Sequence, residues 1–285
     1  MSPELVVLQV LNGLSFGSLL FLLASGFTLV YGLMRIVNLA HGAIYLVGGS
    51  VAVAAASVTD SFVVALLAGV LVAAFVGLIS ERFLLRRLRG QELREVLLTI
   101  GIALLIGDVT LVVFGGHPRS LEPPVPGSVA LGSLSYPAYR LFIIGLALVI
   151  GLGLYLLQYR SRMGAIIRAG VDDREMAGAI GIDINRAFTA LFVLGSALAG
   201  LAGVTAAGLL TMRPGADTDI LLFALVVVIV GGLGSVGGAA VGSVLIGLID
   251  AFSKVWAPEL SIFAVFAPMA IVLVLRPSGL LGRTA

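Results

Sequence analysis

Long apolar runs separated by short polar segments dominate this chain. Most of the runs have about 18 or more residues, enough to cross a bilayer core of roughly 30 Å as a helix. They do not alternate apolar and polar positions, as the strands of a membrane β-barrel would. The pattern therefore predicts an all-α polytopic membrane protein with eight to nine transmembrane or half-spanning helices. The runs lie at 5–31, 38–56, 62–85, 96–114, 141–158, 187–210, 220–230, 239–252 and 260–275.

A polar interruption near residues 32–42 predicts a first broken helix. The stretch "GLMRIVNLAHG" places Asn38 and His41 between two glycines, Gly32 and Gly42. Backbone can leave helical geometry inside a bilayer only where protein or water satisfies its polar groups, and transporters place such breaks at cavities. We expect Asn38 to cap the second helix through its side chain. We expect His41 in the first turn of that helix, donating to a neighbouring helix.

Two interpretations of this first break stay open. In one, His41 is a structural histidine that joins two helices by a hydrogen bond. In the other, Asn38, His41 and Gly42 line or gate a translocation pathway. No second histidine or carboxylate lies nearby in the sequence to form a proton relay or a metal site.

A glycine-rich stretch, "GGLGSVGG", predicts a second break near residues 231–238. Gly231, Gly232 and Gly234 resemble a phosphate-binding loop only superficially, because no lysine and no Ser/Thr pair follows them. A re-entrant turn or a close helix crossing is favoured, since small residues let membrane helices approach. We assign these three glycines to the translocation pathway as well.

Charged residues make up only 11% of the chain, far below the roughly 25% of soluble domains. Asp108 lies well inside the fourth apolar run, and an intramembrane acid is a functional candidate by default. It is predicted either to line the pathway or to bond another helix or a partner subunit. Asp250 and Lys254 are four residues apart, a spacing that predicts an ion pair on one helical face.

Arginine placement predicts the orientation of the chain. Short cytoplasmic loops carry excess Lys and Arg, so the arginine-rich segments 86–95, 159–186 and 275–285 are expected on the cytoplasmic side. The proline-rich segment 115–140 and "TMRPGADTD" then fall outside, and nine crossings would put the N-terminus outside too. The whole chain, 1–285, is predicted to form one membrane domain, in which no loop is large enough to fold as a soluble domain.

Several functions are disfavoured by what the sequence lacks. It has no cysteine, which excludes thiolate metal sites and cysteine nucleophiles. No Ser/His/Asp set, carboxylate dyad or metal cluster stands out, and no basic tract suggests nucleic acid. The first residues, "MSPELVVLQV", lack a basic n-region, so a cleaved signal peptide is not expected.

The cytoplasmic segment 159–186 is expected to contain one short surface helix, "VDDREMAGAIG". Asp172 can cap this helix, and Glu175 three residues later completes a capping-box spacing. Asp173 and Glu175 in the first turn suit the positive end of the helix dipole. Gly181 is a natural C-terminal stop. An ordinary solvated connector is the alternative interpretation.

Four segments together resemble the permease subunits of branched-chain amino acid ABC importers, most closely the H-type subunit. They are "NLAHGAIYLVGG", "SRMGAIIRAGVDDREMAGAIGID", "VVIVGGLGSVGGAAVGSVLIGLID" and "LRPSGLLG". In "EMAGAIG", the family's E-A-A-x-x-x-G loop is matched except that Met176 replaces one alanine. In that family this helix docks into a groove of the ATPase. The resemblance implies that coupling to the ATPase involves Arg168, Asp172, Asp173, Arg174, Glu175, Ala177 and Gly181.

The resemblance also implies a multi-pass subunit of the bacterial inner membrane, surrounded by lipid. It implies a second related permease, two cytoplasmic ATPase subunits and a periplasmic substrate-binding protein as partners. ATP is then used by the ATPase subunits, and this chain binds no cofactor and has no catalytic site. Alternatives are a urea or short-amide importer permease, a stand-alone secondary transporter that uses Asp108 for ion coupling, and a membrane scaffold.

Overall fold

The computed structural model describes residues 3–132, 134–172, 174–179 and 181–282, and it is helical over most of its length. Each of the nine predicted runs forms a helix, so the all-α prediction is confirmed. The helices are α1 (Pro3–Met34), α2 (His41–Thr59), α3 (Phe62–Ile79), α4 (Glu92–Phe114), α5 (Ala138–Arg160), α6 (Arg162–Asp172), α7 (Arg174–Ala179), α8 (Ile184–Ala207), α9 (Ala216–Gly231), α10 (Val236–Trp256) and α11 (Ser261–Leu275).

Eight helical stretches in the described part of the chain are long and apolar enough to cross a membrane. They do not include α9, whose 16 residues would reach only about 24 Å. This length is short of a bilayer core, so α9 is the half-spanning helix of the set.

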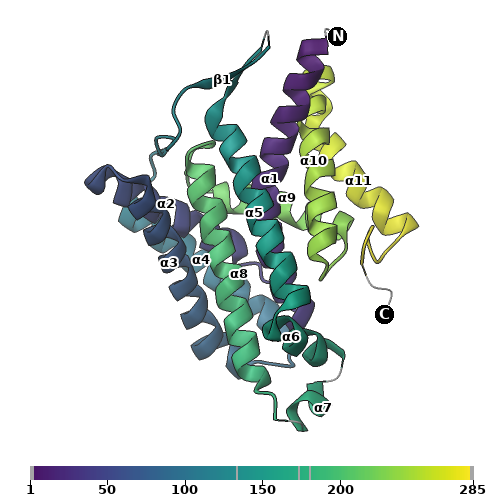
Figure 1. Ribbon diagram of the computed structural model, residues 1–285. Coiled ribbons are helices and arrows are strands. Elements are labelled where there is room, and N and C mark those ends of the chain that lie inside the picture. Colours follow the sequence, from purple (N-terminus) through teal and green to yellow (C-terminus); the bar gives the residue numbers. More distant parts are fainter. Residues whose placement is uncertain (1–2, 133, 173, 180, 283–285) are drawn as a thin grey trace.

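The two ends of the molecule differ in structure (Figure 1). The N-terminus and a hairpin of β1 (Ser128–Leu131) and β2 (Leu134–Pro137) lie at one end, and α6 and α7 lie at the other. The sequence did not predict this hairpin. Arginines gather on α6 and in the α3–α4 turn, so the expectation that this end is cytoplasmic rests on the excess of Lys and Arg in cytoplasmic loops. By the same rule the N-terminus is predicted to lie outside, and this orientation stays a prediction.

The core is formed by α1 and α8, with α2, α3 and α10 packed against them. Glycines make this packing close. A Cβ added to Gly48 would lie 2.7 Å from the Cα of Gly200, and one added to Gly69 would lie 2.5 Å from the carbonyl oxygen of Gly48. Three helices therefore meet backbone to backbone, the arrangement that small residues permit in membranes.

The outer faces of α4, α5 and α11 remain apolar and exposed, which fits contact with lipid or with a second subunit. Examples are Leu105 on α4, Leu152 on α5 and Ile262 on α11. Asp250 and Lys254 form the predicted ion pair on α10, at 2.6 Å. The exposed surface of α4 also includes Asp108, which is described below.

The "GGLGSVGG" stretch forms the tight turn from α9 into α10. Gly232 and Gly234 have φ of +107° and +81°, a left-handed backbone that favours glycine. The C-terminal segment closes over this turn, because the amides of Leu280 and Leu281 donate to the carbonyls of Val230 and Gly231, each at 2.9 Å. The C-terminal segment thereby satisfies carbonyls that the end of α9 leaves free.

Replacing Gly203 of α8 by valine should weaken the fold. A Cβ there would lie 2.1 Å from the carbonyl oxygen of Tyr45, so α2 and α8 would have to separate. Overpacking of this kind typically costs about 1–3 kcal/mol. We expect a lower thermal midpoint in detergent. The matched control is Gly145→Val on α5, where no atom lies within 4 Å, and equal midpoints for the two variants would contradict the packing described here.

Candidate functional site

The chain leaves helical geometry between α1 and α2 and turns back toward the middle of the molecule. Arg35 follows α1 with φ of 53°, and α2 begins only at His41. His41 Nε2 donates to the carbonyl oxygen of Leu23 on α1 at 3.0 Å, since a carbonyl can only accept. Leu23 lies 11 residues before the end of α1 at Met34, about 16 Å along the helix. The second helix therefore starts at membrane depth, as predicted.

His41 is fully buried and serves as a cross-link between α1 and α2. Its ring packs edge to face on Phe27, with the centroids 5.7 Å apart, and Nδ1 has no hydrogen-bond partner among the described residues. The predicted donation to a neighbouring helix is confirmed. A role for His41 in a pathway stays a prediction, because its side chain does not line the groove described below.

The predicted cap by Asn38 is wrong in its geometry. The N-cap position of α2 is Ala40, which has no side-chain cap bond. Asn38 instead folds the turn before the helix, since its Oδ1 accepts from the amide of Ala40 at 3.1 Å and its carbonyl from the amide of His41 at 3.2 Å. Asparagine favours such local turns as readily as a cap.

A second helix also begins at this depth. A Cβ on Gly42 would lie 2.3 Å from the carbonyl oxygen of Asp217, so the first turn of α9 packs directly against the first turn of α2. We expected "TMRPGADTD" to be a simple outer loop, yet its second half starts α9 inside the molecule. The available sequence signal was the run at 220–230, which is too short to span a bilayer.

A groove of about 410 Å³ opens where α2, α4 and α9 meet. Its walls are largely apolar and include Leu39, Leu46, Leu104 and Leu221. Two carboxylic acids also line the groove: Asp108 from α4 and Asp217 from the first turn of α9.

Asp108 is exposed on α4 although it lies six residues, or about 9 Å, before the end of that helix at Phe114. The described residues offer its side chain no hydrogen bond or ion pair. A charged side chain at this depth is costly against lipid, so such groups face a water-filled cavity or another protein. Asp108 lines the groove, and its role in a pathway stays a prediction.

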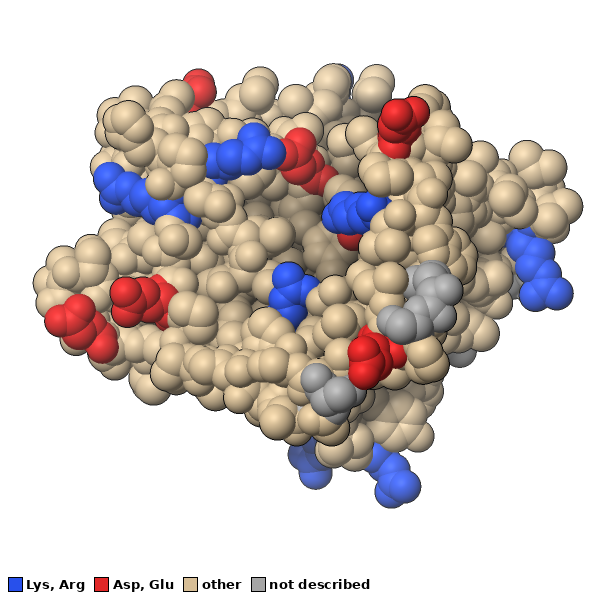
Figure 2. All heavy atoms as spheres, turned by 90° about the horizontal axis from the view of Figure 1, so that it is seen from above, with Lys and Arg blue, Asp and Glu red and all other residues tan. Residues whose placement is uncertain are grey.

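A smaller cavity of about 30 Å³ continues the groove toward the outer end. The two share Leu46, Gly107, Leu111 and Pro214, and the outer cavity also reaches His117 and Arg119. Seen from this end, the surface is hollowed near its middle, with charged side chains of both signs around the hollow (Figure 2). Gly231, Gly232 and Gly234 line neither cavity and lie at the other end of α9, so their assignment to the pathway stays a prediction.

The cytoplasmic segment contains two helices rather than the predicted one. Residues 162–172 form α6, and Asp172 is its last residue, so the predicted helix is divided near its start; the predicted cap by Asp172 lies outside what the structure describes. The expectation of a polar connector overlooked Met163, Ile166 and Ile167, which form an apolar face against the start of α8. Asp173 and the side chains of Asp172, Arg174 and Glu175 lie outside the described residues.

The other predicted coupling residues have defined contacts in and around α7. Ala177 is buried among Ile167, Ile184 and Phe188. Gly181 has φ of +88° and ends the helix, as predicted, with its amide donating to the carbonyl of Gly178 at 3.0 Å. The Arg168 guanidinium donates to the carbonyl of Gln158 at the end of α5. The coupling role of these residues stays a prediction.

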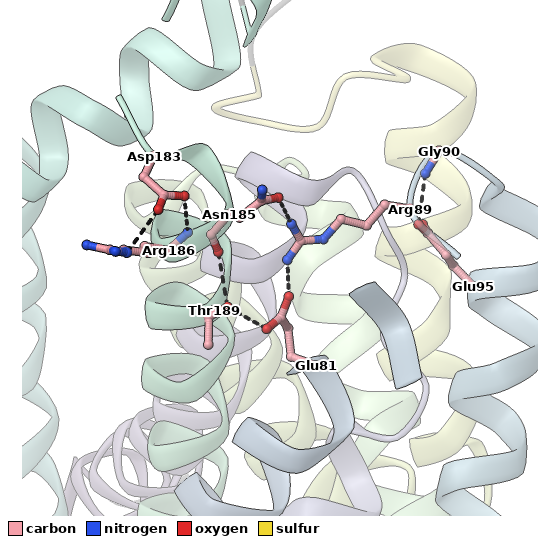
Figure 3. A network of polar contacts seen from close by, with 8 residues as sticks. All are labelled: Glu81, Arg89, Gly90, Glu95, Asp183, Asn185, Arg186 and Thr189. Atoms are coloured by element: carbon pink, nitrogen blue, oxygen red, sulfur yellow. Dashed lines mark hydrogen bonds and ion pairs between the residues drawn. The ribbon is translucent and has the colours of Figure 1, made fainter. Parts of the chain in front are cut away.

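A polar network that the sequence did not reveal ties the α3–α4 turn to α8 (Figure 3). Glu81 lies in the π-helical turn η1 (Ser80–Leu84) after α3 and is fully buried. Its carboxylate pairs with Arg89 and accepts from the hydroxyl of Thr189 at 2.5 Å. Arg89 also donates to Asn185, and its guanidinium lies 4.7 Å from the ring centroid of Phe188. A lone acid at the end of an apolar run was the only sequence signal.

These features define a class: a polytopic membrane permease with two helices that start inside the bilayer beside a groove. Comparison with known proteins gives the family. The profile described as "Branched-chain amino acid transport system / permease component" matches residues 9–275. The chain belongs to this family.

Individual relatives agree with this assignment. The chain is 30% identical to the high-affinity branched-chain amino acid transport system permease protein BraD of Pseudomonas aeruginosa, over 96% of this chain and 95% of that protein. It is 29% identical to LivH of Escherichia coli, over the same shares. The D-allose transport system permease protein AlsC of Escherichia coli is 26% identical over 75% of this chain and 66% of its own length.

A solved structure titled PsaBC from Streptococcus pneumoniae in complex with Fab aligns with a TM-score of 0.51. The alignment covers 94% of this chain and 91% of that chain, at 15% identity. This likeness supports the fold alone.

Replacing His41 by alanine should lower transport. The variant loses the bond to Leu23 that fixes the start of α2 beside the groove, and one such bond contributes about 0.5–1.5 kcal/mol. We expect the protein to assemble in the membrane at near-normal yield while solute uptake falls several-fold. Ser57→Ala, at the exposed outer end of α2, serves as the control. Wild-type uptake by a well-assembled His41→Ala protein would contradict the prediction.

Proposed function

We propose that this chain is the membrane-spanning subunit of an ATP-driven ABC importer in a bacterial inner membrane, and that it carries branched-chain or other hydrophobic amino acids. Its partners are a second related permease, two cytoplasmic ATPase subunits and a periplasmic substrate-binding protein. The groove between α2, α4 and α9 is the observation that carries the proposal. The names of the relatives BraD and LivH support the choice of solute.

The groove fits an amino acid with an apolar side chain. Such a solute combines a branched hydrocarbon with an ammonium and a carboxylate group. The leucine walls suit the hydrocarbon, and the carboxylates of Asp108 and Asp217 suit the ammonium. The volume of the groove, about 410 Å³, is in the usual range for small-molecule sites. Urea, the solute of the alternative importer, has neither an apolar part nor a charge to use these walls.

The energy source is proposed to act through the cytoplasmic end. The segment around α7 is where an ATPase would dock, with Glu175, Ala177 and Gly181 at the spacing of the coupling motif. Closure of the ATPase would then change the access of solute to the groove. This chain itself binds no cofactor in the proposal, and ATP is used by the ATPase subunits. A secondary transporter coupled to ions through Asp108 would need no such docking helix.

Reconstitution separates these functions. We would purify the chain with its co-purifying subunits, place the complex in liposomes, and measure uptake of radiolabelled leucine with the loaded binding protein. The proposal expects uptake that requires ATP and is insensitive to ion gradients. Uptake by this chain alone, driven by a proton or sodium gradient, would overturn it in favour of a secondary transporter.

Replacing Asp108 by asparagine should impair recognition of the ammonium group. A hydrogen bond to a charged group contributes about 1.5–3 kcal/mol, so we expect kcat/KM for leucine uptake to fall at least about tenfold. Glu122→Gln removes the same charge from the exposed outer loop and should leave uptake unchanged. Equal kinetics of the Asp108→Asn and wild-type proteins would contradict the assignment of the groove.

A further inference from the structure

We propose that the buried ion pair of Glu81 and Arg89 couples the cytoplasmic end of α8 to α4, so that movement of α7 and α8 shifts α4 along the groove. This inference rests on the proposed function, because an ATPase supplies the movement. In this role Glu81 and Arg89 are positioning residues that touch no solute. A chain of contacts leads from α7 to the groove.

The first link joins α7 to Arg89. Ala177 of α7 packs into an apolar cluster that contains Phe188 of α8. The guanidinium of Arg89 lies over the ring of this same Phe188, 4.7 Å from its centroid, and donates to Asn185 one turn earlier. A displacement of α7 therefore reaches Arg89 through residues in the first two turns of α8.

The second link joins Arg89 to the end of α3. Arg89 is paired with Glu81, whose side chain has no exposed surface, and Thr189 of α8 donates to the other carboxylate oxygen. Figure 3 shows Glu81 pointing at Arg89 and Thr189 together. Both oxygens of the acid are thus used to hold the α3–α4 turn against α8. The π-helical turn that contains Glu81 is a geometry found frequently at functional sites.

The third link joins the turn to the groove. The amide of Gly90, next to Arg89, donates to Glu95 in the first turn of α4 at 3.0 Å. Farther along α4, the hydroxyl of Thr99 accepts from the amide of Leu39 at 3.2 Å, in the non-helical segment before α2. Still farther, Asp108 lines the groove. One helix therefore connects the network, the broken segment and the pathway.

The remaining packing of α4 leaves it able to move. Its main neighbour is α2, and most of its surface is exposed. A charged pair is a poor choice if the turn only had to be held, because burying two charges costs about as much as their attraction returns. The buried ion pair does fix which segments contact each other and in which register, and a mechanical connection between two helices requires both.

The test measures solute moved per ATP hydrolysed by the complete transporter in liposomes. Coupling free energies usually correspond to about 5- to 150-fold effects, so Glu81→Gln should lower this ratio at least about fivefold while ATP hydrolysis continues. Arg86→Gln removes one charge from the same turn at an exposed site and should keep the wild-type ratio. Thr189→Val, which deletes only one donor to Glu81, is the milder variant and should lower the ratio less.

A double variant separates coupling from simple stability. Glu81→Gln combined with Arg89→Gln leaves no unpaired buried charge, so folding yield should recover. Under the proposal the ratio stays low, because the connection is still broken. A ratio restored to the wild-type value in the double variant would overturn the proposal.

A distance measurement tests the connection between α4 and α8 even if leucine is not the solute. The chain has no cysteine, so spin labels can be placed at Leu97→Cys on α4 and Ala190→Cys on α8, both exposed positions. Glu81→Gln should broaden the distribution of distances between the two labels. An unchanged distribution would overturn the connection, whereas absence of ATP-driven uptake by the wild-type complex would overturn only the proposed function.

Discussion

The backbone between α1 and α2 leaves helical geometry inside the membrane, where water cannot satisfy its amides, and the rest of the site depends on how the protein satisfies them. Asn38 accepts from Ala40, and Thr99 of α4 accepts from Leu39. The bond from His41 to Leu23 fixes the helix that follows. These contacts let α2 begin at depth, and only there can its first turn meet α9.

The meeting of two helix starts creates the groove and explains its composition. Gly42 is required at this crossing, because any side chain would strike the carbonyl of Asp217. Apolar side chains from α2, α4 and α9 then line the space together with Asp108, and a charge at this depth requires surroundings other than lipid. The same helix, α4, also contacts the turn that holds Glu81 and Arg89, so the proposed pathway and the proposed coupling end share one structural element.

The sequence predicted the parts of this structure that depend on local pattern. Apolar runs located nine of the eleven α-helices in the described residues, all except α6 and α7, and Asn38 with His41 located the first break. An ion pair between residues four apart, Asp250 and Lys254, was also predictable. What was missed depends on contacts between distant segments. Glu81 and Thr189 are 108 residues apart, and nothing in the run that precedes Glu81 indicates its partner. The apolar residues of α6 alternate in the sequence with arginines and glycines, so this segment was expected to be a polar connector.

The central claim is that the groove of α2, α4 and α9 is the route of the solute. Its most direct test uses Leu104→Cys, on the groove wall, in the otherwise cysteine-free chain. A membrane-impermeant thiol reagent should label this position in the assembled transporter, and ATP with the loaded binding protein should change the labelling rate. Leu152→Cys, on the exposed face of α5, should stay unlabelled. Equal resistance of both positions to the reagent in every state would contradict the account.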